Sequence, residues 1–592
     1  IVGVVANNNA VIKNYGTIEI KGEGNTGILL ANGGDNEGND PVNLDGAEGV
    51  VRKRIEPTGK KINGVEIVAP GNGTATIKRN GKPVVPTLVD TIPAKPNEIT
   101  AGATTLDLAE APSLTRASSL GMYVDTSGRQ FTNPIQGLEH LTNLKEVNLI
   151  FGIEATNYTD SKDIQVGENI LSPYNNTIST LSRNGKTKFN LNSGSLTWIA
   201  TGTQNPDDTF NAVYLSKIPY TAYAKDKDTY NFMDGLEQRY GVEGVNSREK
   251  ALFDKLNAIG KGEPQLFAQA VDQMKGHQYS NVQQRVNATE RALDKEFDYL
   301  RNEWRNTTKN SNKIKAFGMR DEYNTDTAGV IDYTSNAYGV AYVHENETVK
   351  LGNSSGWYAG AVNNNFRFKD IGKSRESQTM LKAGIFKTMS PMTDHNGSLQ
   401  WTIGGDVFVG RNEMKRKYLV VDDIFEAKSA YNTYGVSLKN ELGYDIRMSE
   451  RNHLRPYGSL KMEYGRFNDI RENEGEIRLE VEGNDYFSVK PEVGLEFKYV
   501  QPLAVKTQLS VGLSAAYENE LGKVGDVNNS AKVRFTDADK FGIRGEKEDR
   551  RGNGKFDLNI GIDNTRFGVT VNAGYDTKGH NVRGGIGFRA IY

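Results

Sequence analysis

The chain has 592 residues, a formal net charge of −2 and no cysteine, and it contains 63 glycines, 27 tyrosines and 22 phenylalanines. The lack of cysteine excludes disulfides, thiol catalysis and cysteine-based zinc sites, and the near-neutral charge provides no basic field for nucleic acid. The many glycines and aromatic residues favour turns and strands, and no apolar run approaches the roughly 18–20 residues of a transmembrane helix.

Residues 1–115 are predicted to form the C-terminal coils of a β-solenoid passenger. The string GVVANN at residues 3–8 recurs as GILLAN at residues 27–32, about one solenoid coil later. Prolines gather between about residues 80 and 115 and indicate an irregular excursion from the solenoid. Because the chain starts at Ile1 without an initiator methionine or a signal peptide, we expect it to be part of a longer protein.

The first segment also contains a G-x-G-x-x-G motif, at Gly22, Gly24 and Gly27. In a dinucleotide-binding enzyme a helix starts at these glycines, and its first N–H groups hold the pyrophosphate. Here the next residues include Gly33, Gly34 and further helix breakers. We therefore interpret the motif as corner turns between strands, with a phosphate site as the alternative.

Residues 116–223 are predicted to cap the solenoid. They contain strand-like runs such as KTKFNLNSGSLTWIA at residues 186–200 and AVYLSKIPYTAY at residues 212–223. A solenoid must shield the open edge of its last coil. Trp198 and the tyrosines of this region suit that task.

Residues 224–311 are predicted to form an α-helical linker. One of its helices opens with Pro264 and closes before Gly276, which are the expected boundary residues. Residues 281–311 then read as one long helix that is too charged to lie in lipid and carries a narrow apolar stripe at helical spacing. The stripe consists of Val286, Leu293, Phe297, Leu300 and Trp304.

Residues 312–592 alternate between apolar and polar side chains with period 2. We count about twelve such segments, with loops expected at about residues 415–430 and 520–550. Most segments are about 10–14 residues long, whereas strands of soluble sheets usually have about 5–6 residues and transmembrane strands about 9–11. The pattern predicts a 12-stranded antiparallel transmembrane β-barrel; the alternative is a soluble antiparallel sheet with one solvated face.

The two faces of these strands differ as a membrane barrel requires. One face carries aliphatic and aromatic side chains that suit lipid, and the other carries polar side chains that suit a wet lumen. We assign the following residues to the lumen: Lys490, Glu492, Glu496, Lys498, Lys506, Arg583 and Arg589.

The last residues, NVRGGIGFRAIY, alternate in the same way. Ile586, Phe588, Ala590 and Tyr592 share one register and resemble the C-terminal signal by which bacterial outer-membrane barrels are recognised for assembly. Tyr592 stands where phenylalanine is commoner in that signal.

The order of the segments resembles the C-terminal part of a type Va (monomeric) autotransporter. Members of this family have a right-handed β-helical passenger, an autochaperone-like cap, an α-helical linker and a twelve-stranded barrel. Residues 251–300 resemble the stretch that leads into the barrel-threading helix of the family. The junction VYLSKIPYTAYAKD and the Gly/Asn-rich coils look most like the large fusobacterial outer-membrane adhesins of the RadD type.

The resemblance implies that helix 281–311 sits inside the barrel and plugs the pore after export. It implies export without a nucleotide, helped by the barrel-assembly machinery. It also implies a monomer in the bacterial outer membrane, in contact with lipid and lipopolysaccharide. The passenger is then expected to stay uncleaved at the cell surface and to bind a receptor on a host or bacterial cell.

No sequence motif predicts an enzyme, a cofactor or a metal site. GNSSG at residues 352–356 fits the G-x-S-x-G of hydrolases, but a strand follows it where that motif requires a helix. The six histidines are scattered, without metal-ligand spacing. We predict a translocator and anchor that displays a β-helical adhesin and has no nucleic-acid partner. The alternatives are a porin-like channel and an autotransporter whose enzymatic passenger lies upstream.

Overall fold

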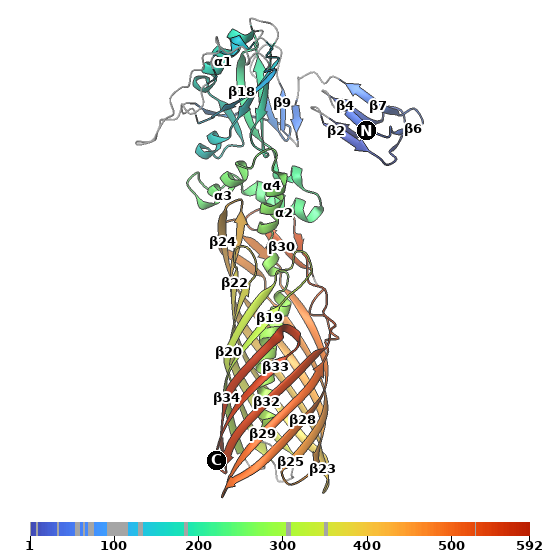
Figure 1. The fold of residues 1–592 in the computed structure, drawn as a ribbon, viewed down its shortest axis with the longest axis vertical. Helices are drawn as coiled ribbons and strands as arrows, with labels where there is room; N and C mark the ends of the chain where they lie inside the picture. Colours follow the sequence, from blue (N-terminus) through green and yellow to red (C-terminus); the bar gives the residue numbers. More distant parts are fainter. Residues whose placement is uncertain are drawn as a thin grey trace. The chain divides into compact units, whose positions relative to one another are not determined.

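The chain divides into two compact units, Ile1–Ala222 and Tyr223–Tyr592, whose elements are drawn in Figure 1. The computed structural model describes residues 2–6, 10–31, 35–53, 60–62, 65–68, 76–90, 117–127, 134–135, 137–141, 143–182, 187–205, 207–303, 310–347, 353–526 and 528–591.

The first unit begins with stacked coils of short parallel strands. The strands are β1 Val2–Ala6, β2 Val11–Asn14, β3 Glu19–Lys21, β4 Thr26–Ala31, β5 Asp35–Gly38, β6 Val42–Leu44 and β7 Glu48–Lys53. β1, β4 and β7 form one ladder, and the pairs β2–β5 and β3–β6 form two others. Val2 lies beside Thr26 and Thr26 beside Glu48, so successive coils take 24 and 22 residues. Ile28 and Leu30 are buried with Ala6 between the ladders.

The G-x-G-x-x-G motif lies at a corner of this solenoid. Gly22 and Gly24 have φ angles of 96° and 79°, in the turn that joins β3 to β4. Glycine suits that turn because positive φ carries no steric penalty for it. Gly27 lies within β4, and within residues 10–31 the structure shows no helix that could hold a phosphate.

The rest of the first unit mixes parallel and antiparallel sheets. Its elements are β8 Lys60–Ile62, β9 Val65–Val68, β10 Thr76–Arg79, β11 Lys82–Val84, β12 Thr87–Val89, β13 Ser119–Val124, β14 Glu146–Phe151, β15 Asp163–Val166, α1 Glu168–Ser182, β16 Lys188–Ser193, β17 Trp198–Gln204 and β18 Phe210–Lys217. β13, β14 and β16 are parallel, whereas β15, β18 and β17 are antiparallel. Trp198, Tyr214 and Tyr220 are buried. Residues 91–115 of the expected excursion lie outside the described residues.

Among the described residues of the second unit, four α-helices precede the barrel: α2 Lys227–Arg239, α3 Arg248–Asn257, α4 Pro264–Met274 and α5 Val282–Glu303. Asp226 and Ser247 cap α2 and α3 by accepting backbone N–H groups, and Pro264 opens α4 as expected. Within the part of the chain that the structure describes, no helix has both the length and the apolar character needed to cross a membrane.

The helix predicted over residues 281–311 is shorter in the structure. α5 is described to Glu303, and strand pairing begins at Asn310, opposite Asn346. The extended backbone needed for that pairing excludes helix at the end of the predicted range. Trp304, the last residue of the predicted stripe, lies outside the described residues.

Twelve antiparallel strands form the barrel. They are β19 Asn310–Tyr323, β20 Tyr333–Glu347, β21 Ser354–Phe368, β22 Arg375–Thr393, β23 Gly397–Val420, β24 Asp423–Arg447, β25 Asn452–Phe467, β28 Asn484–Ala504, β29 Thr507–Glu518, β32 Asn553–Asn564, β33 Phe567–Asp576 and β34 Asn581–Ile591. β34 pairs with β19 and closes the cylinder. The predicted mainly-β fold class, with a 12-stranded antiparallel barrel around a helix, is confirmed (Figure 1).

The expectation of a loop at residues 415–430 is wrong. β23 and β24 run through this stretch as one hairpin, and only residues 421 and 422 form the turn. Outward-facing side chains at this end of the hairpin are polar, as at Lys415 and Lys428, so the apolar alternation that marks the other strands is absent there. The hairpin continues beyond the apolar part of the barrel surface.

Four short strands extend the sheet at the same end: β26 Ile470–Gly475, β27 Leu479–Val481, β30 Asn529–Val533 and β31 Phe541–Ile543. The stretch 520–550, expected to be a loop, therefore contains two of them. Helix α2 packs on this small sheet, with the rings of Phe232 and Phe541 5.4 Å apart. Helices α3 and α4 contact β23. The small sheet, the end of the hairpin and these helices together form what we call the neck of the barrel.

Candidate functional site: a helix inside the barrel lumen

Helix α5 lies inside the barrel (Figure 1) and contacts β19, β20, β21, β22, β25 and β28. Its apolar stripe is buried: Val286, Leu293, Phe297 and Leu300 are at most 2% exposed. A Cβ at Gly360 of β21 would lie 2.7 Å from Leu293 Cδ2 and 2.9 Å from the carbonyl oxygen of Val340, so glycine leaves room for the helix at this place. The ring of Phe297 packs 4.5 Å from that of Tyr358. The stripe thus seats the helix against one wall of the lumen.

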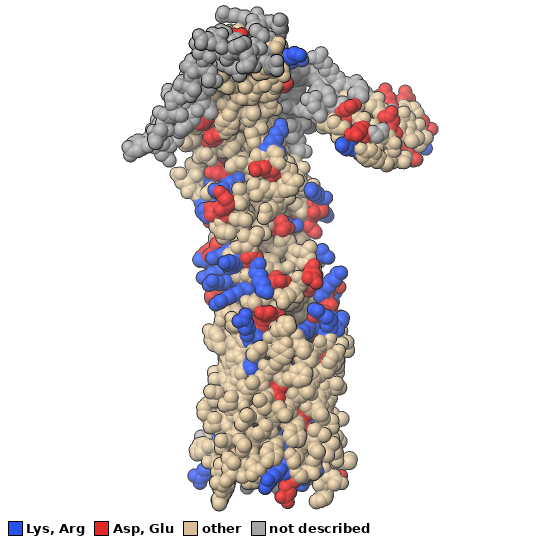
Figure 2. Space-filling model, viewed as in Figure 1, with Lys and Arg blue, Asp and Glu red and all other residues tan. Residues whose placement is uncertain are grey.

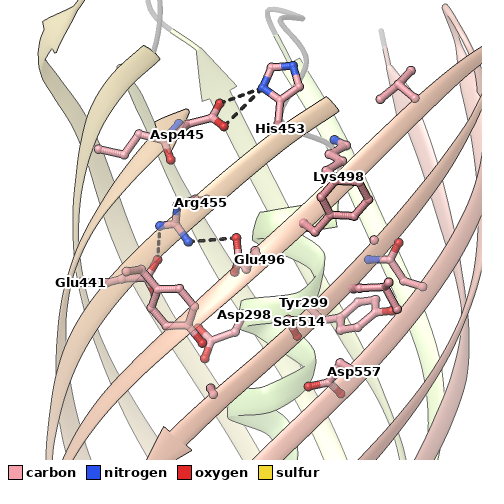
Figure 3. Close-up of a pocket in the computed structure, with 18 of the residues that line it drawn as sticks. Asp298, Tyr299, Glu441, Asp445, His453, Arg455, Glu496, Lys498, Ser514 and Asp557 are labelled. Carbon is pink, nitrogen blue, oxygen red and sulfur yellow. Dashed lines mark hydrogen bonds and ion pairs between the residues drawn. The ribbon is translucent and has the colours of Figure 1, made fainter. Parts of the chain in front are cut away.

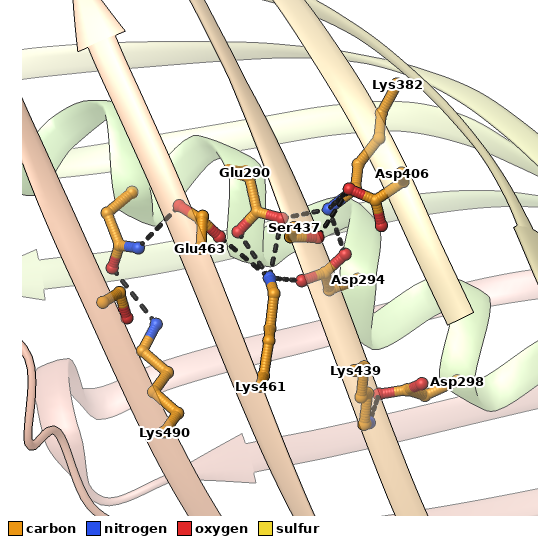
Figure 4. A network of polar contacts seen from close by, with 12 residues as sticks. Glu290, Asp294, Asp298, Lys382, Asp406, Ser437, Lys439, Lys461, Glu463 and Lys490 are labelled. Atoms are coloured by element: carbon orange, nitrogen blue, oxygen red, sulfur yellow. Dashed lines mark hydrogen bonds and ion pairs between the residues drawn. The ribbon is translucent and has the colours of Figure 1, made fainter. Parts of the chain in front are cut away.

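The polar face of α5 is bound to strands of the barrel wall through buried charges (Figure 4). Lys461 of β25 donates to both carboxylate oxygens of Glu290, with N–O distances of 2.7 and 2.8 Å, and also contacts Asp294. Lys382 of β22 contacts the same two acids. Each lysine therefore ties two successive turns of the helix to the barrel wall.

Two further acids complete this group. Lys461 Nζ lies 2.9 Å from Glu463 Oε2, and Lys382 Nζ lies 3.3 Å from Asp406 Oδ1. Carboxylate oxygens of Glu290 and Glu463 lie within 4.8 Å of one another and of Asp294, an arrangement that could hold a metal ion. The two ammonium groups supply the positive charge at this place. Removing one of them would leave buried carboxylates without compensation, which is strongly unfavourable.

The first turns of α5 are held by a second set of contacts. Arg285 donates to Glu376 of β22 over 2.8 Å, and both side chains are fully buried. Thr289 donates to Gln378 on the same strand over 2.6 Å, and accepts from Asn364 of β21 over 3.1 Å. These bonds satisfy groups that would otherwise be buried without partners.

Other strands bind the remaining sides of the helix. Lys315 of β19 lies 2.5 Å from Glu296, between Nζ and Oε2. Asn287 accepts from Lys490 of β28 over 3.2 Å. Lys295 contacts Asp576 of β33. The helix is therefore attached to strands around the circumference of the barrel, so it could leave only by breaking many buried polar contacts together.

The lumenal residues predicted from the sequence lie in three places. Lys490 meets α5 directly through Asn287. Arg583 donates to Asp576 over 2.6 Å, beside the contact of Lys295. Glu492, Glu496 and Arg589 contact strand residues within the lumen: Glu492 accepts from Lys555, Glu496 from Arg455, and Arg589 donates to Asp563. Lys498 lines a cavity in the lumen.

Lys506 is the exception among these predicted residues. It lies in the turn between β28 and β29, exposed, with a φ angle of 65°. The alternation of β29 begins only at Thr507, because residues 505 and 506 form the hairpin turn. Period 2 cannot be counted through a turn, and the lumenal assignment of Lys506 is wrong.

A polar cavity of about 590 Å³ remains beside the last turns of α5. Figure 3 shows Asp298 and Tyr299 of the helix on one side and Arg455, Glu496 and Lys498 of the strands on the other. Arg455 donates to Glu496 over 3.0 Å and also contacts Glu441. The lumen is thus packed around the middle of the helix and hollow near its end.

Sequence analysis missed the wall residues that make most of the contacts. Lys315, Lys382 and Lys461 were not assigned to the lumen, although each occupies an inward-facing position of an alternating strand. The signal was present: each lysine has apolar residues as immediate neighbours on the opposite face, such as Leu381 beside Lys382. Which acid each lysine meets depends on the rotation of the helix, which period alone does not determine.

The residues of the C-terminal signal lie on β34. Ile586 and Phe588 are exposed on the outer face and pair in register with Ala316 and Ile314 of β19. Ala590 shares their register. Tyr592 lies outside the described residues. These side chains are therefore next to the seam where the first and last strands close the barrel.

Comparison with known proteins relates the barrel to one family. Residues 314–576 match the family model described as the autotransporter beta-domain. Similar solved structures include the translocator domain of autotransporter NalP from Neisseria meningitidis, with 12% identity over 52% of this chain and 96% of that chain and a TM-score of 0.39. The transport unit of AIDA-I from Escherichia coli has 12% identity over 51% and 99%, with a TM-score of 0.36.

The beta domain of the Bordetella autotransporter BrkA is similar with 11% identity over 48% of this chain and all of that chain, with a TM-score of 0.36. No curated protein matches the chain. The family match relates residues 314–576, most of the barrel, to autotransporter beta-domains.

Proposed function

We propose that residues 223–592 anchor the chain in a bacterial outer membrane and carry the preceding residues to the cell surface, as the translocator of a type V autotransporter. The observation that carries this proposal is the path of the chain through the barrel. Gln283, at the start of α5, donates to Asn529 of the neck over 2.8 Å. Ser311, just after the helix, pairs with Ile591 at the opposite end. The chain therefore runs through the lumen from the neck to the opposite end of the barrel, where the first strand begins and the last strand ends.

This path gives the two ends of the barrel different roles. The residues before α5 emerge at the neck, whereas both ends of the barrel sequence lie at the other end. The passenger side is then the cell exterior, and the other end faces the periplasm. After export α5 stays in the lumen as a plug, held by the contacts of Lys382 and Lys461. A porin-like channel does not explain a helix bound so extensively inside its pore.

We propose further that assembly and display follow the pattern of the family. The barrel-assembly machinery recognises the side chains that share one register at the end of the chain: Ile586, Phe588, Ala590 and Tyr592. Nucleotide and cofactor play no part in export. The barrel works as a monomer, because a closed cylinder leaves no strand edge to pair.

We propose that the passenger is a β-helical adhesin of the fusobacterial type that binds a host or bacterial cell. The parallel coils of residues 2–53 support this, because stacked coils present extended flanks suited to binding large partners. The surface outside the membrane is where such a passenger has to act.

The proposal is tested by the location of the passenger in intact cells. The full chain is expressed in Escherichia coli behind a signal peptide, with an epitope tag placed before Ile1. We expect protease added outside intact cells to remove the tag while the barrel stays protected. A tag that is cleaved only after the outer membrane is permeabilised, in cells whose barrel is folded, would contradict the export direction.

A further inference from the structure

The outer surface of β21, β22 and β23 changes sharply from apolar to polar along the barrel. Ala361, Leu381 and Val409 lie side by side in register and mark the last apolar row. Two residues further toward the neck, Thr379 pairs with Arg411. On the face of the barrel that Figure 2 presents, the lower part is mostly uncharged and ends at a belt where Lys and Arg gather among acidic residues. The belt starts where the membrane-facing surface of the proposed translocator stops.

Three cations of this belt face one another across neighbouring strands. Arg367 of β21 pairs in register with Arg375 of β22, and Arg375 pairs with Lys415 of β23. All three side chains are exposed. Lys428 of β24 lies opposite Lys415 and continues the row, but Glu474 pairs with it. Like charges directly opposite each other destabilise a sheet. This row therefore costs stability unless an anion lies over it.

Other cations of the belt have acidic partners of their own. Lys428 Nζ lies 2.9 Å from Glu474, Arg466 lies 3.6 Å from Asp485, and Arg320 lies 3.6 Å from Glu322. Among the described residues, no acidic side chain lies within 4.0 Å of the charged groups of Arg367, Arg375 or Lys415. Glu376, next to Arg375, is buried and pairs with Arg285 in the lumen, and Glu413, exposed two residues before Lys415, lies on the outer face. The row thus keeps a local excess of positive charge.

The surface between the apolar edge and the cation row is polar and uncharged on two strands. Asn363 donates to Ser377 over 3.1 Å and to Thr379 over 2.9 Å. Asn365 donates to Asn363 over 2.7 Å, which fixes the orientation of this amide ladder. Amides and hydroxyls suit the hydroxyl groups of a sugar. The ladder spans the six residues from Leu381 to Arg375, about 20 Å along the strand or about 15 Å along the axis of a tilted barrel.

We propose that this face of β21–β23, which we call the β21–β23 surface, binds a phosphorylated glycolipid of the outer leaflet. The acyl chains would lie on the apolar rows, the sugars on the amide ladder, and phosphate groups on Arg411 and on the row of Arg367, Arg375 and Lys415. Arginine forms paired, charge-assisted hydrogen bonds with phosphate oxygens. The inference rests on the proposed function, because it requires the neck to face the cell exterior.

The test measures binding of rough-type lipopolysaccharide to the full chain in detergent. The variant Arg367→Gln, Arg375→Gln, Lys415→Gln removes the row. The variant Arg320→Gln, Arg466→Gln, Arg551→Gln removes three exposed cations that have acidic partners and lie outside the row, as a matched control. We expect the first variant to bind more than about tenfold more weakly and the control to stay within about threefold of the unmodified chain. Equal affinities of both variants and the unmodified chain would overturn the proposal.

Further arms identify the chemistry. The same glycolipid after chemical removal of its phosphates should bind more than about tenfold more weakly, and equal binding would overturn the role of phosphate. Inorganic phosphate should displace the glycolipid only at a much higher concentration than the glycolipid itself. Displacement at equal concentrations would mean that the site binds a free anion and would overturn the lipid assignment. An acidic peptide that binds as tightly as the glycolipid would point to a protein partner and contradict the lipid assignment.

Folding is followed in parallel by the change in gel mobility on heating. The single variant Arg375→Gln provides a second test if the triple variant folds poorly, and it should weaken binding while the mobility change persists. If the row variants fold but bind the glycolipid as tightly as the unmodified chain, the glycolipid inference alone is overturned. A chain without any heat-dependent mobility change in detergent overturns the proposed translocator itself.

Discussion

Lys461 shows most clearly how single residues hold the helix in the lumen. Its ammonium group contacts Glu290, Asp294 and Glu463, and its side chain is 13% exposed. We expect Lys461→Met to lower the free energy of unfolding by about 3–5 kcal/mol, because a buried pair loses one partner. The measurement is the temperature at which the folded band disappears in cold gel electrophoresis.

Lys428 is the control for that variant, since its pair with Glu474 lies on the surface. Lys428→Met should leave the melting temperature nearly unchanged, as surface pairs contribute little. Adding Glu290→Gln to Lys461→Met should recover part of the loss, because it removes one uncompensated charge. A melting temperature that falls equally for Lys461→Met and Lys428→Met would contradict the buried network.

The faces of β28 allow a second comparison of single residues. Leu495 is 46% exposed on the outer face, whereas Lys498 borders the lumenal cavity. Leu495→Arg should cost about 2–4 kcal/mol because it places a charge against lipid near mid-strand, while Lys498→Gln should be mild. Folding yields in detergent measure the difference between the two variants. Equal yields would contradict the assignment of Leu495 to the lipid face and Lys498 to the lumen.

At the scale of elements, the strands were easier to predict from sequence than the contacts between them. Alternation identified β28, β29, β32 and β33 because their outer positions are apolar along most of their length. It failed at residues 415–430, where the hairpin leaves the apolar band: outer positions such as Lys415 become polar, and the apolar residues, such as Tyr418 and Phe425, face inward. The partner of each lumenal lysine was beyond reach, because it depends on how helix and barrel are rotated relative to each other.

Removing the helix tests its role as a plug. We expect a chain lacking residues 282–303 to conduct ions in a planar bilayer, because the lumen would lose the side chains that fill its middle. A chain lacking residues 1–222 keeps the helix and should stay nearly closed. Low conductance of the helix-deleted chain, with a folded barrel shown by gel mobility, would exclude the plug.

The fit between α5 and β21 predicts the effect of a single methyl group. A Cβ at Gly360 would lie 2.7 Å from Leu293 and 2.9 Å from the carbonyl oxygen of Val340, whereas a Cβ at Gly458 meets nothing closer than 3.8 Å. Gly360→Ala should therefore cost about 1–3 kcal/mol through overpacking, and Gly458→Ala should change little. Thermal unfolding in detergent compares the two, and equal losses would mean that the helix does not press against this wall.

At the scale of the whole molecule, the division into Ile1–Ala222 and Tyr223–Tyr592 separates two kinds of sheet. The first unit stacks parallel coils whose apolar side chains point inward between ladders. The second exposes apolar side chains outward and buries charges inside. Amino-acid composition alone does not distinguish the two units, because both are rich in strand-forming residues. They are distinguished by the length of each predicted strand and by the period of its apolar residues.

The inversion predicts that residues 223–592 fold without the first unit, provided that detergent covers their outer face. The barrel closes by pairing β34 with β19 inside this unit, and the lumenal helix and the neck belong to it too, so no barrel strand needs a partner from the first unit. We expect this part alone, like the full chain, to migrate faster on a gel before boiling than after it and to have strand-dominated circular dichroism. A soluble product whose mobility does not change on heating would mean that the exposed apolar rows pack against protein instead of lipid, and the membrane assignment would fail with them.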